Sequence, residues 1–532
     1  MKNNFNKYSK LLVICFLIIN LVLPLCVLFK SISYTDIINT LSHPNFFIMF
    51  INSIITSFLG ASLSLILAFL LSYCLNRTKV KYKNAISILI TLPMLIPSIS
   101  HGTGLIFLLG ENGIITNLLN VNIHLYGHIG IVLGSMMYTF PPAFLMIDDI
   151  LKYEDYTPYE AACVLGISKF KQFINITLPY IKKPTFSIFL ASFTMIFSDY
   201  GVPLTVGGKV MTLPTFMYQE VIGMMDFSKG AFLSLILLVP AMIVFYFDLK
   251  SQSTTVDNLG GKTYEINNIK YIDIISNTFC IIICIIIILP IVSFIYLSVV
   301  KQFPIDMSYS FNNIIHVYNL NVIEYLINSI SISLGVGLLG LIIIYLSAYL
   351  TSRSNKSIST TILHLISLLT LAIPGIVLGL SYVLFFNNSN LYGTIFIIII
   401  VNIVHFFASP YLLAYNALRK FSISYEEVAS TLGIGKLKLL IDVYLPSTRS
   451  TLLEMYSYLF VNSMVTISAV SFLAGIQTTP LSLLIPQFDS QSMIQVTATI
   501  SLIILVINLS LKLIIYIIKK HFEKGDLNHA NN

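Results

Sequence analysis

Few residues of this chain have the types and spacing that enzymatic chemistry requires. The 532 residues include 9 histidines and 6 cysteines. Five of the cysteines lie inside apolar runs without metal-ligand or disulfide spacing, which is typical of small buried hydrophobic residues. His124 and His128 are four residues apart, but Gly127 lies between them beside a loop, so the pair predicts no metal site. The chain is therefore expected to be no enzyme and to hold no metal or cofactor.

A phosphate-binding loop would read G-x-x-x-x-G-K-[ST], and one stretch matches only the end of that pattern. Gly261-Lys262-Thr263 supplies the last three residues, but Val256 stands where the first glycine belongs. The stretch follows polar linker residues rather than a strand. We interpret the match as a coincidence, so any ATP would be bound by separate subunits.

The composition places the chain in a membrane. Hydrophobic residues make up 56% and charged residues 10% of it, and the mean hydropathy is +0.87. A soluble domain is about 25% charged, so a soluble enzyme and a disordered chain are excluded. The net charge of +7 does not indicate a nucleic-acid partner, because the charges lie in short clusters between apolar runs. Met1–Lys30 has a basic start and an apolar stretch without a cleavage site, and it reads as a retained first span.

Twelve apolar segments are long enough to cross a bilayer as helices. They are 11–29, 47–75, 85–109, 126–147, 184–203, 230–248, 272–298, 323–351, 360–385, 391–416, 450–475 and 495–518. One set of alternating loops then carries 26 of the 30 lysines and arginines. The other set carries only Lys30, Lys209, Lys229 and Lys301. By the positive-inside rule both termini are expected to be cytoplasmic.

The chain contains an internal repeat. Residues 160–179 read EAACVLGISKFKQFINITLP and residues 427–446 read EVASTLGIGKLKLLIDVYLP, with ten of twenty positions identical at an offset of 267. Further matched residues are Asn52-Ser53 with Asn328-Ser329, Arg77 with Arg353, Pro97 with Pro374 and Gly102 with Gly379. Since each half has an even number of spans, the halves should be related by a pseudo-two-fold axis along the membrane normal.

These patterns predict an all-α polytopic membrane protein of about twelve transmembrane helices in two tandem six-helix repeats. The first half is predicted at 1–250, with a cytoplasmic loop at 150–183. A linker is predicted at 251–271, and the second half at 272–532 with its loop at 417–449.

The repeated cytoplasmic loop is the most informative feature of the sequence. Thr157–Glu160 and Ser424–Glu427 each read as a capping box that starts a short helix. Gly166 and Gly433 then suit a helix end that needs a left-handed residue. A helix this short is marginal in water, so the same loop made twice indicates two equivalent docking partners.

The spacing Glu-Ala-Ala, three residues, Gly, nine residues, Ile, one residue, Leu-Pro resembles the loop signature of permease subunits of bacterial ABC importers. The matching residues are Glu160, Ala161, Ala162, Gly166, Ile176, Leu178 and Pro179, and then Glu427, Ala429, Gly433, Leu445 and Pro446. The second copy departs at Val428 and Val443, and both changes are mild. The resemblance covers nearly the whole chain and implies a type I importer permease fold in the bacterial cytoplasmic membrane.

The resemblance implies that each loop forms a coupling helix in a cleft of an ATP-binding subunit. Closure of two such ATPase subunits would swing the membrane halves from inward-open to outward-open. The implied partners are these subunits, an extracytoplasmic substrate-binding protein, a small-molecule or ion substrate and the lipid bilayer, and no nucleic acid is implied. The expected coupling residues are Glu160, Ala161, Ala162, Gly166, Glu427, Ala429 and Gly433. The two glutamates could close the capping boxes, pair with a basic residue of the ATPase, or do both.

Polar groups within spans are costly in lipid and are candidates for the translocation path. These candidates are Asp199, Tyr200, Asn462, Ser463, Thr466 and Ser468. Asp199 could instead lie near the outer headgroups, and the hydroxyl residues could instead support helix packing. Asn52 and Asn328 are expected to bond between helices, and Pro97 and Pro374 are expected to break helices.

The fused form of the chain resembles a narrower group of permeases. The residues that carry this resemblance are the SDYGVP run at 198–203, Gly207-Gly208, and the YQEVIG run at 218–223. The group implies 2-aminoethylphosphonate as the substrate, and otherwise iron(III), thiamine or a polyamine. The segments 204–229 and 476–494 would then face the substrate-binding protein.

Two rival classes remain. An ion-coupled secondary transporter with six plus six spans would need coupling carboxylates or a basic signature between spans two and three. The loop 76–84 is basic but lacks that signature, and both repeated loops would be unexplained. A membrane enzyme would need an acid and base pair or a metal cluster at one depth, and the sequence offers none.

Overall fold

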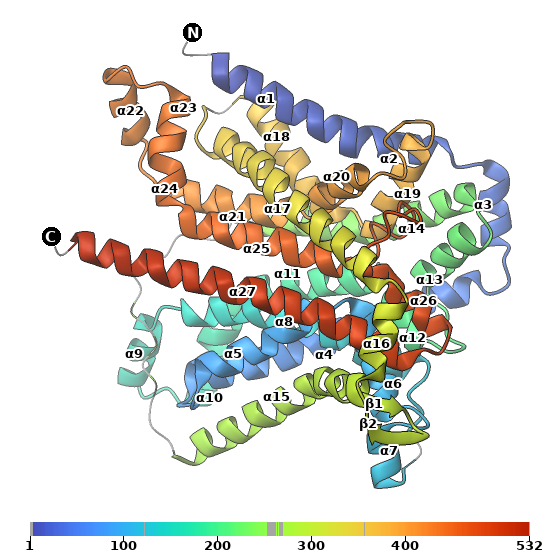
Figure 1. Cartoon of the computed structure of the whole chain (residues 1–532). Helices are drawn as coiled ribbons and strands as arrows, with labels where there is room; N and C mark the ends of the chain where they lie inside the picture. Colours follow the sequence, from blue (N-terminus) through green and yellow to red (C-terminus); the bar gives the residue numbers. More distant parts are fainter. Residues whose placement is uncertain are drawn as a thin grey trace.

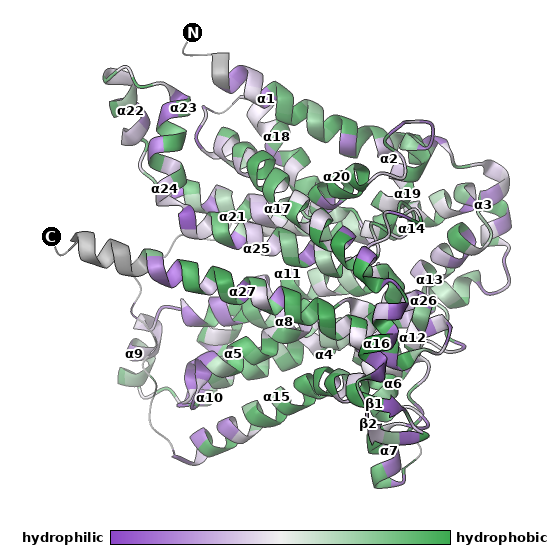
Figure 2. Ribbon diagram, in the orientation of Figure 1, coloured by the Kyte–Doolittle hydropathy of each residue, from purple (hydrophilic) through white to green (hydrophobic). Residues whose placement is uncertain are grey.

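The computed structural model describes residues 4–121, 123–252, 262, 264, 266, 270–355 and 357–530. These residues form a bundle of helices with one short hairpin (Figure 1). Most helices are apolar along their middles, and hydrophilic residues gather toward the two ends of the bundle (Figure 2). An all-α fold follows from this arrangement, because backbone polar groups in lipid must be satisfied within each helix.

The elements of the first half run from α1 to α14. They are α1 (Asn4–Leu17), η1 (Ile18–Val22), α2 (Leu23–Lys30), α3 (Tyr34–Leu41), α4 (Phe46–Arg77), α5 (Lys83–Thr91), η2 (Leu92–Leu95), α6 (Ser98–Leu109), α7 (Ile114–Leu119), α8 (His128–Lys152), α9 (Thr157–Val164), α10 (Lys169–Gln172), η3 (Phe173–Thr177), α11 (Leu178–Phe197), α12 (Gly201–Val206), α13 (Leu213–Tyr218), η4 (Gln219–Gly223) and α14 (Phe227–Gln252).

The elements of the second half run from α15 to α27. They are α15 (Lys270–Val299), β1 (Val300–Gln302), β2 (Asp306–Tyr309), α16 (Asn312–Asn319), α17 (Val322–Ser352), α18 (Ile358–Leu369), η5 (Thr370–Ala372), α19 (Gly375–Phe386), α20 (Ile395–His405), α21 (Ala408–Arg419), α22 (Ser424–Thr431), α23 (Lys436–Leu439), η6 (Leu440–Tyr444), α24 (Leu445–Ser447), α25 (Arg449–Val465), η7 (Leu481–Leu483), α26 (Leu484–Ser490) and α27 (Ile494–Ala530). The strands β1 and β2 pair antiparallel.

The predicted spans all contain helices, but not all of them are continuous. By length and composition, the described residues include 8 helices able to cross a membrane, or up to 10 if each of 2 bent pairs is one span. The bent pairs are α18–η5 with α19, at 110°, and α20 with α21, at 54°. The remaining two predicted spans are α11 and α25, which end at Phe197 and Val465. The predicted count of twelve exceeds ten because these two helices do not meet the criteria of length and composition: α25 has only 17 residues, and α11 has 20 residues but is not apolar enough.

The third and ninth predicted spans are broken at their prolines. Pro97 precedes α6 and Pro374 precedes α19, and neither residue is helical. A proline disfavours the helical conformation of the residue before it, and both preceding isoleucines, Ile96 and Ile373, are extended. The prediction that these prolines break helices is confirmed.

The first helix of each half packs against the other half. Helices α1 and α2 contact α17, α18 and α19, while α15 contacts α4, α5 and α6. The Tyr382 hydroxyl of α19 donates to the carbonyl of Asn20, at 2.6 Å. Cys280 and Cys284 of α15 are buried against apolar residues of α4 and α8. The halves are thus consecutive in sequence and interlocked in packing.

The repeated Asn-Ser pairs hold the segments that follow the two fifth spans. The Asn52 side chain donates to the carbonyl of Met211 at 3.1 Å, and the Ser53 hydroxyl oxygen accepts the N–H of Leu213 at 2.8 Å. In the same way, the Asn328 side chain donates to the carbonyl of Gln477 at 2.8 Å, and the Ser329 hydroxyl oxygen accepts the N–H of Leu481 at 2.6 Å. The asparagines were expected to bond between helices. Asn52 does also meet His128 of α8, at 2.9 Å, but the bonds that both halves share connect a helix to a loop.

The two repeated loops lie at the same end of the bundle. Helices α9 and α10 lie there together with α22 and α23, the start of α1 and the end of α27 (Figure 1). The predicted linker at 251–271 falls mostly outside the described residues, although Lys262 and Tyr264 within it are described.

Candidate functional site

Each repeated loop begins with a cap that differs from the predicted one. No side chain of Thr157–Glu160 or Ser424–Glu427 caps its own helix. In the first loop, Asp155 Oδ1 accepts the N–H of Thr157, at 3.1 Å, and its hydroxyl, at 2.8 Å. In the second loop, the Ser422 hydroxyl oxygen accepts the N–H and the hydroxyl of Ser424, at 3.2 and 2.7 Å.

The predicted capping boxes are therefore wrong, and the cap lies two residues earlier in both copies. Asp155 and Ser422 are separated by the repeat offset, so the device itself is repeated. The N–H of Thr157, which Asp155 accepts, lowers the pKa of that exposed carboxyl. Glu160 is left available for a contact outside its own helix.

The prediction of a left-handed glycine at each helix end is confirmed. Gly166 has φ of +67° and Gly433 has φ of +72°. The N–H of Ile167 bonds to the carbonyl of Ala162 at 2.9 Å, and that of Ile434 bonds to Ala429 at 2.8 Å. This is the Schellman arrangement, which satisfies the last carbonyls of a helix and turns the chain sharply.

A short π-helix follows each loop helix. η3 and η6 are both five residues long and lie directly before Leu178-Pro179 and Leu445-Pro446. A proline removes one backbone donor and crowds the carbonyl four residues earlier, and a wider turn relieves that crowding. The signature prolines therefore explain a bulge that connects each loop to its span.

The loop surfaces are apolar although they lie beyond the ends of the spans. In the first loop Val164 and Leu165 are 87% and 75% exposed, and in the second Leu432 is 69% exposed. Ala162 and Ala429 are buried, while Ala161 is exposed. Exposed apolar side chains next to charged ones are typical of a protein interface.

A buried arginine clamps the first loop to the end of α4. Arg77 donates to the Glu154 carboxylate in an ion pair whose side chains are 4% and 2% exposed. Arg77 also donates to the carbonyl of Leu151 at 3.2 Å, and the Tyr159 hydroxyl of α9 donates to Glu154 at 2.6 Å. Burial raises the pKa of Glu154 although the Tyr159 and Arg77 bonds lower it.

The second loop carries the same clamp made from other positions. Arg353 donates to both carboxylate oxygens of Glu426, at 2.7 and 2.5 Å, and to the Phe421 carbonyl at 2.9 Å. The Tyr444 hydroxyl donates to Glu426 at 2.6 Å. By the repeat offset Glu426 corresponds to Tyr159 and Tyr444 corresponds to Thr177, so the carboxylate of the second clamp stands where the first clamp has its phenol.

The sequence analysis missed both clamps. Arg77 and Arg353 were matched as repeated residues, but their partners do not correspond in the repeat. The available signal was the conjunction of a repeated arginine with two glutamates in each loop, which does not show which glutamate the arginine holds. Each clamp joins a span end, a loop helix and the chain that enters it.

The candidate path residues of the first half lie where the fifth span stops. Asp199 Oδ1 accepts the Ser98 hydroxyl at 2.7 Å, and Oδ2 accepts the N–H of Val202 at 2.9 Å. Tyr200 is fully buried and donates to the Ile467 carbonyl at 3.5 Å. Asp199 therefore holds α12 to α6, and Tyr200 connects the break in this half to the break in the other.

Thr466 marks the matching break in the second half. It is buried and extended after the last residue of α25, and its carbonyl accepts the Ser482 hydroxyl at 2.8 Å. Ser468 lies against Gly375 at the start of α19, where a Cβ on that glycine would be 2.3 Å from the serine hydroxyl. The contact with Gly375 brings Ser468 to the proline break of the ninth span.

Asn462 and Ser463 belong to the last turn of α25. Asn462 donates to the carbonyl of Tyr458 in its own helix, at 2.8 Å. Ser463 is 4% exposed, and its hydroxyl has no hydrogen-bond partner among the described residues.

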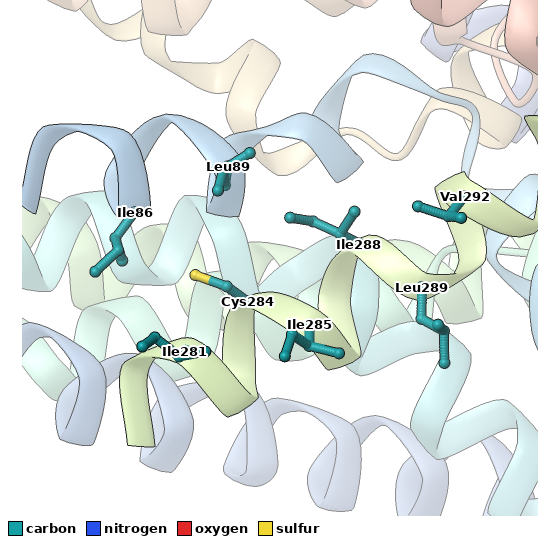
Figure 3. Close-up of a pocket in the computed structure, with 8 residues that line it drawn as sticks. All are labelled: Ile86, Leu89, Ile281, Cys284, Ile285, Ile288, Leu289 and Val292. Carbon is teal, nitrogen blue, oxygen red and sulfur yellow. The ribbon is translucent and has the colours of Figure 1, made fainter. Parts of the chain in front are cut away.

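An apolar cavity of about 380 Å³ lies between α5 and α15. Figure 3 shows its lining, which is seven aliphatic side chains and Cys284. Such a lining offers no group that could pair with a charged or polar substrate.

Comparison with known proteins yields a family and several relatives. The family described as "Binding-protein-dependent transport system inner membrane component" matches residues 60–250 and 340–525. The chain is 26% identical over 437 residues to "Ferric transport system permease protein FbpB" of Actinobacillus pleuropneumoniae, which covers 77% of this chain and 62% of that protein. The "Putative ferric transport system permease protein FbpB 1" of Haemophilus influenzae is 26% identical over 437 residues, covering 77% of this chain and 67% of its own.

The chain thus spans less than two thirds of the Actinobacillus relative. Among solved structures, one titled "Crystal structure of a bacterial ABC transporter involved in the import of the acidic polysaccharide alginate" has a similar chain. The TM-score is 0.40 at 19% identity, covering 48% of this chain and 98% of that chain.

Proposed function

The chain belongs to the family of binding-protein-dependent transport system inner membrane components, and from this membership we propose that it is the permease of an ATP-driven importer. The substrate would cross between the two halves by alternating access, and the chain would catalyse no reaction itself. Two ATP-binding subunits would dock on the repeated loops, and a substrate-binding protein would dock at the opposite end of the bundle. Both termini would then face the cytoplasm.

The observation that carries this proposal is the pair of clamped loops at one end of the bundle. Each loop presents exposed apolar residues and a glutamate, and each is fixed to a span by a buried arginine. A loop that only connected two spans would need neither feature. The proposed coupling residues are Glu160, Ala161, Ala162, Gly166, Glu427, Ala429 and Gly433.

The proposed path runs between the breaks of the fifth spans. Asp199, Tyr200, Asn462, Ser463, Thr466 and Ser468 all lie at or beside these breaks. A helix that ends inside a bundle leaves backbone groups that can face a cavity rather than lipid. The contact between Tyr200 and Ile467 supports a path at the junction of the halves.

For the substrate we propose iron(III) as the first candidate. The support is the pair of relatives that bear the name ferric transport permease. The resemblance of the sequence to 2-aminoethylphosphonate permeases keeps that compound as the second candidate, with thiamine and polyamines after it.

Uptake by cells that lack their own ferric permease tests this function. Cells with the chain, its ATP-binding subunit and its binding protein are expected to accumulate radioactive iron only while ATP is available. Collapse of the proton gradient at constant ATP should leave uptake unchanged. Uptake that follows the proton gradient instead would favour the ion-coupled transporter. Uptake of labelled 2-aminoethylphosphonate but not of iron would contradict iron(III) as the substrate and leave the proposed importer function unchanged.

Asp199→Ala is expected to lower uptake about tenfold while the ATP-binding subunit still copurifies. The variant loses two hydrogen bonds to a carboxylate, each contributing about 1.5–3 kcal/mol, which connect the break after α11 to α6 and α12. Asp199→Asn is the matched control, because it keeps the shape and one acceptor oxygen but removes the charge. Normal uptake by the alanine variant would show that Asp199 has no role in the proposed translocation path.

A further inference from the structure

Two described residues of the linker between the halves, Lys262 and Tyr264, lie against the first loop. The carbonyl of Lys262 accepts the N–H of Tyr156 at 2.9 Å. The N–H of Lys262 donates to Asp155, which also caps α9, at 3.1 Å. Two backbone groups of the linker are thus bonded at the entry to the loop helix.

The side chain of Lys262 reaches Glu160. The two form an ion pair in which the lysine is 50% and the glutamate 41% exposed. Glu160 is the signature carboxylate of the first loop and one of the proposed coupling residues, for which the sequence resemblance implies a basic residue of the ATP-binding subunit as a partner. The chain's own linker already supplies a cation there.

Tyr264 anchors the linker two residues further on. Its ring lies under the Arg77 guanidinium, at 3.8 Å from ring centroid to guanidinium carbon. It also meets the rings of Tyr156 and Tyr159 edge-on, at 4.9 and 5.1 Å. A desolvated cation–π contact is stronger than an exposed ion pair. The anchor is therefore more stable than the contact between Lys262 and Glu160.

The second loop has no corresponding cation in the described part of the chain. Glu427 is exposed and makes no ion pair with any described residue. The chain has one linker for two loops, so the repeat cannot provide both with the same contact.

We propose that Lys262 is a competitive latch on the first repeated loop: its ammonium group pairs with Glu160 until a basic group of an ATP-binding subunit displaces it. This inference rests on the proposed function. The latch makes the two repeated loops unequal, because the first loop then binds an ATP-binding subunit more weakly than the second loop does. Tyr264 keeps the displaced lysine close by, so the latch closes again when the subunit leaves.

The test compares variants of the full chain in lipid nanodiscs, titrated with the ATP-binding subunit that copurifies with it. Lys262→Ala is expected to tighten binding at one of two sites by ~2- to 5-fold, the range that an exposed ion pair provides. Lys262→Arg should bind as the wild type does. Lys270→Ala is the matched control, since it removes the same charge from an exposed position at the start of α15.

A double-mutant cycle identifies the carboxylate. In a Glu160→Gln background, Lys262→Ala is expected to change the affinity by less than about 1.5-fold, because the latch has no carboxylate to occupy. Equal affinities of Lys262→Ala and wild type, or the same gain from Lys270→Ala, would overturn the latch. If the wild type binds no ATP-binding subunit at all, the proposed function has failed, which is a different result.

Discussion

Arg77→Ala is expected to detach the first loop from α4 and to reduce uptake more than tenfold. The variant leaves Glu154 buried without its partner, since that side chain is only 2% exposed. Removal of one partner of a buried ion pair costs about 3–5 kcal/mol. Thermal unfolding of the purified chain and copurification of the ATP-binding subunit would measure the two losses separately.

Replacement of both Arg77 and Glu154 separates the effect of the ion pair on thermal stability from its effect on the position of the first loop. Because burial raises the pKa of Glu154 in spite of the guanidinium, desolvation offsets much of the attraction within the pair. Arg77→Met with Glu154→Met should therefore recover most of the thermal stability. Uptake should stay low, because methionine cannot bond to the Leu151 carbonyl or accept the Tyr159 hydroxyl. Full uptake by this double variant would mean that the clamp has no role in transmission.

Arg353→Ala provides a comparison within the same chain. Glu426 is 25% exposed, so its carboxylate can reach water when the arginine is removed. We expect a smaller loss of stability than for Arg77→Ala. An equal or larger loss would show that the exposure of the carboxylate does not determine the effect.

Gly166→Val combined with Gly433→Val is expected to release the ATP-binding subunits and to abolish uptake without unfolding the spans. Both glycines have left-handed backbones, which costs a side-chain-bearing residue about 1–2 kcal/mol and a β-branched one more. A Cβ at Gly166 would meet no atom within 4 Å, so the effect comes from the backbone rather than from a clash. Copurification and circular dichroism would distinguish release from unfolding.

Gly435→Val is the matched control for this variant. Gly435 lies in the second loop with φ of −72°, and a Cβ there would also meet nothing within 4 Å. A valine is therefore tolerated, and docking and uptake should stay normal. Gly166→Asn should retain part of the docking, because asparagine accepts the left-handed region better than valine does. Loss of docking in the Gly435 variant would contradict an argument from backbone conformation.

Several features of the fold were predictable because they depend on neighbouring residues. The Ile96-Pro97 and Ile373-Pro374 breaks follow from the steric effect of proline on the residue before it. The left-handed turn at Gly166 follows from its place after a short helix. The capping boxes were predicted wrongly, because Asp155 competes for the same N–H groups from two residues earlier.

The sequence by itself determined that the chain spans a membrane, that it is a repeat of two halves, and where its two repeated loops turn. Apolar length, identity at a constant offset and the place of a glycine after a short helix can all be read along the chain without knowing which residues meet in space. Only the tertiary structure decided which carboxylate pairs with each repeated arginine, and that the first helix of each half packs against the other half. It alone placed Lys262 on Glu160 in one loop only. These contacts join residues far apart in the chain, and equivalent contacts are built from positions that do not correspond in the repeat.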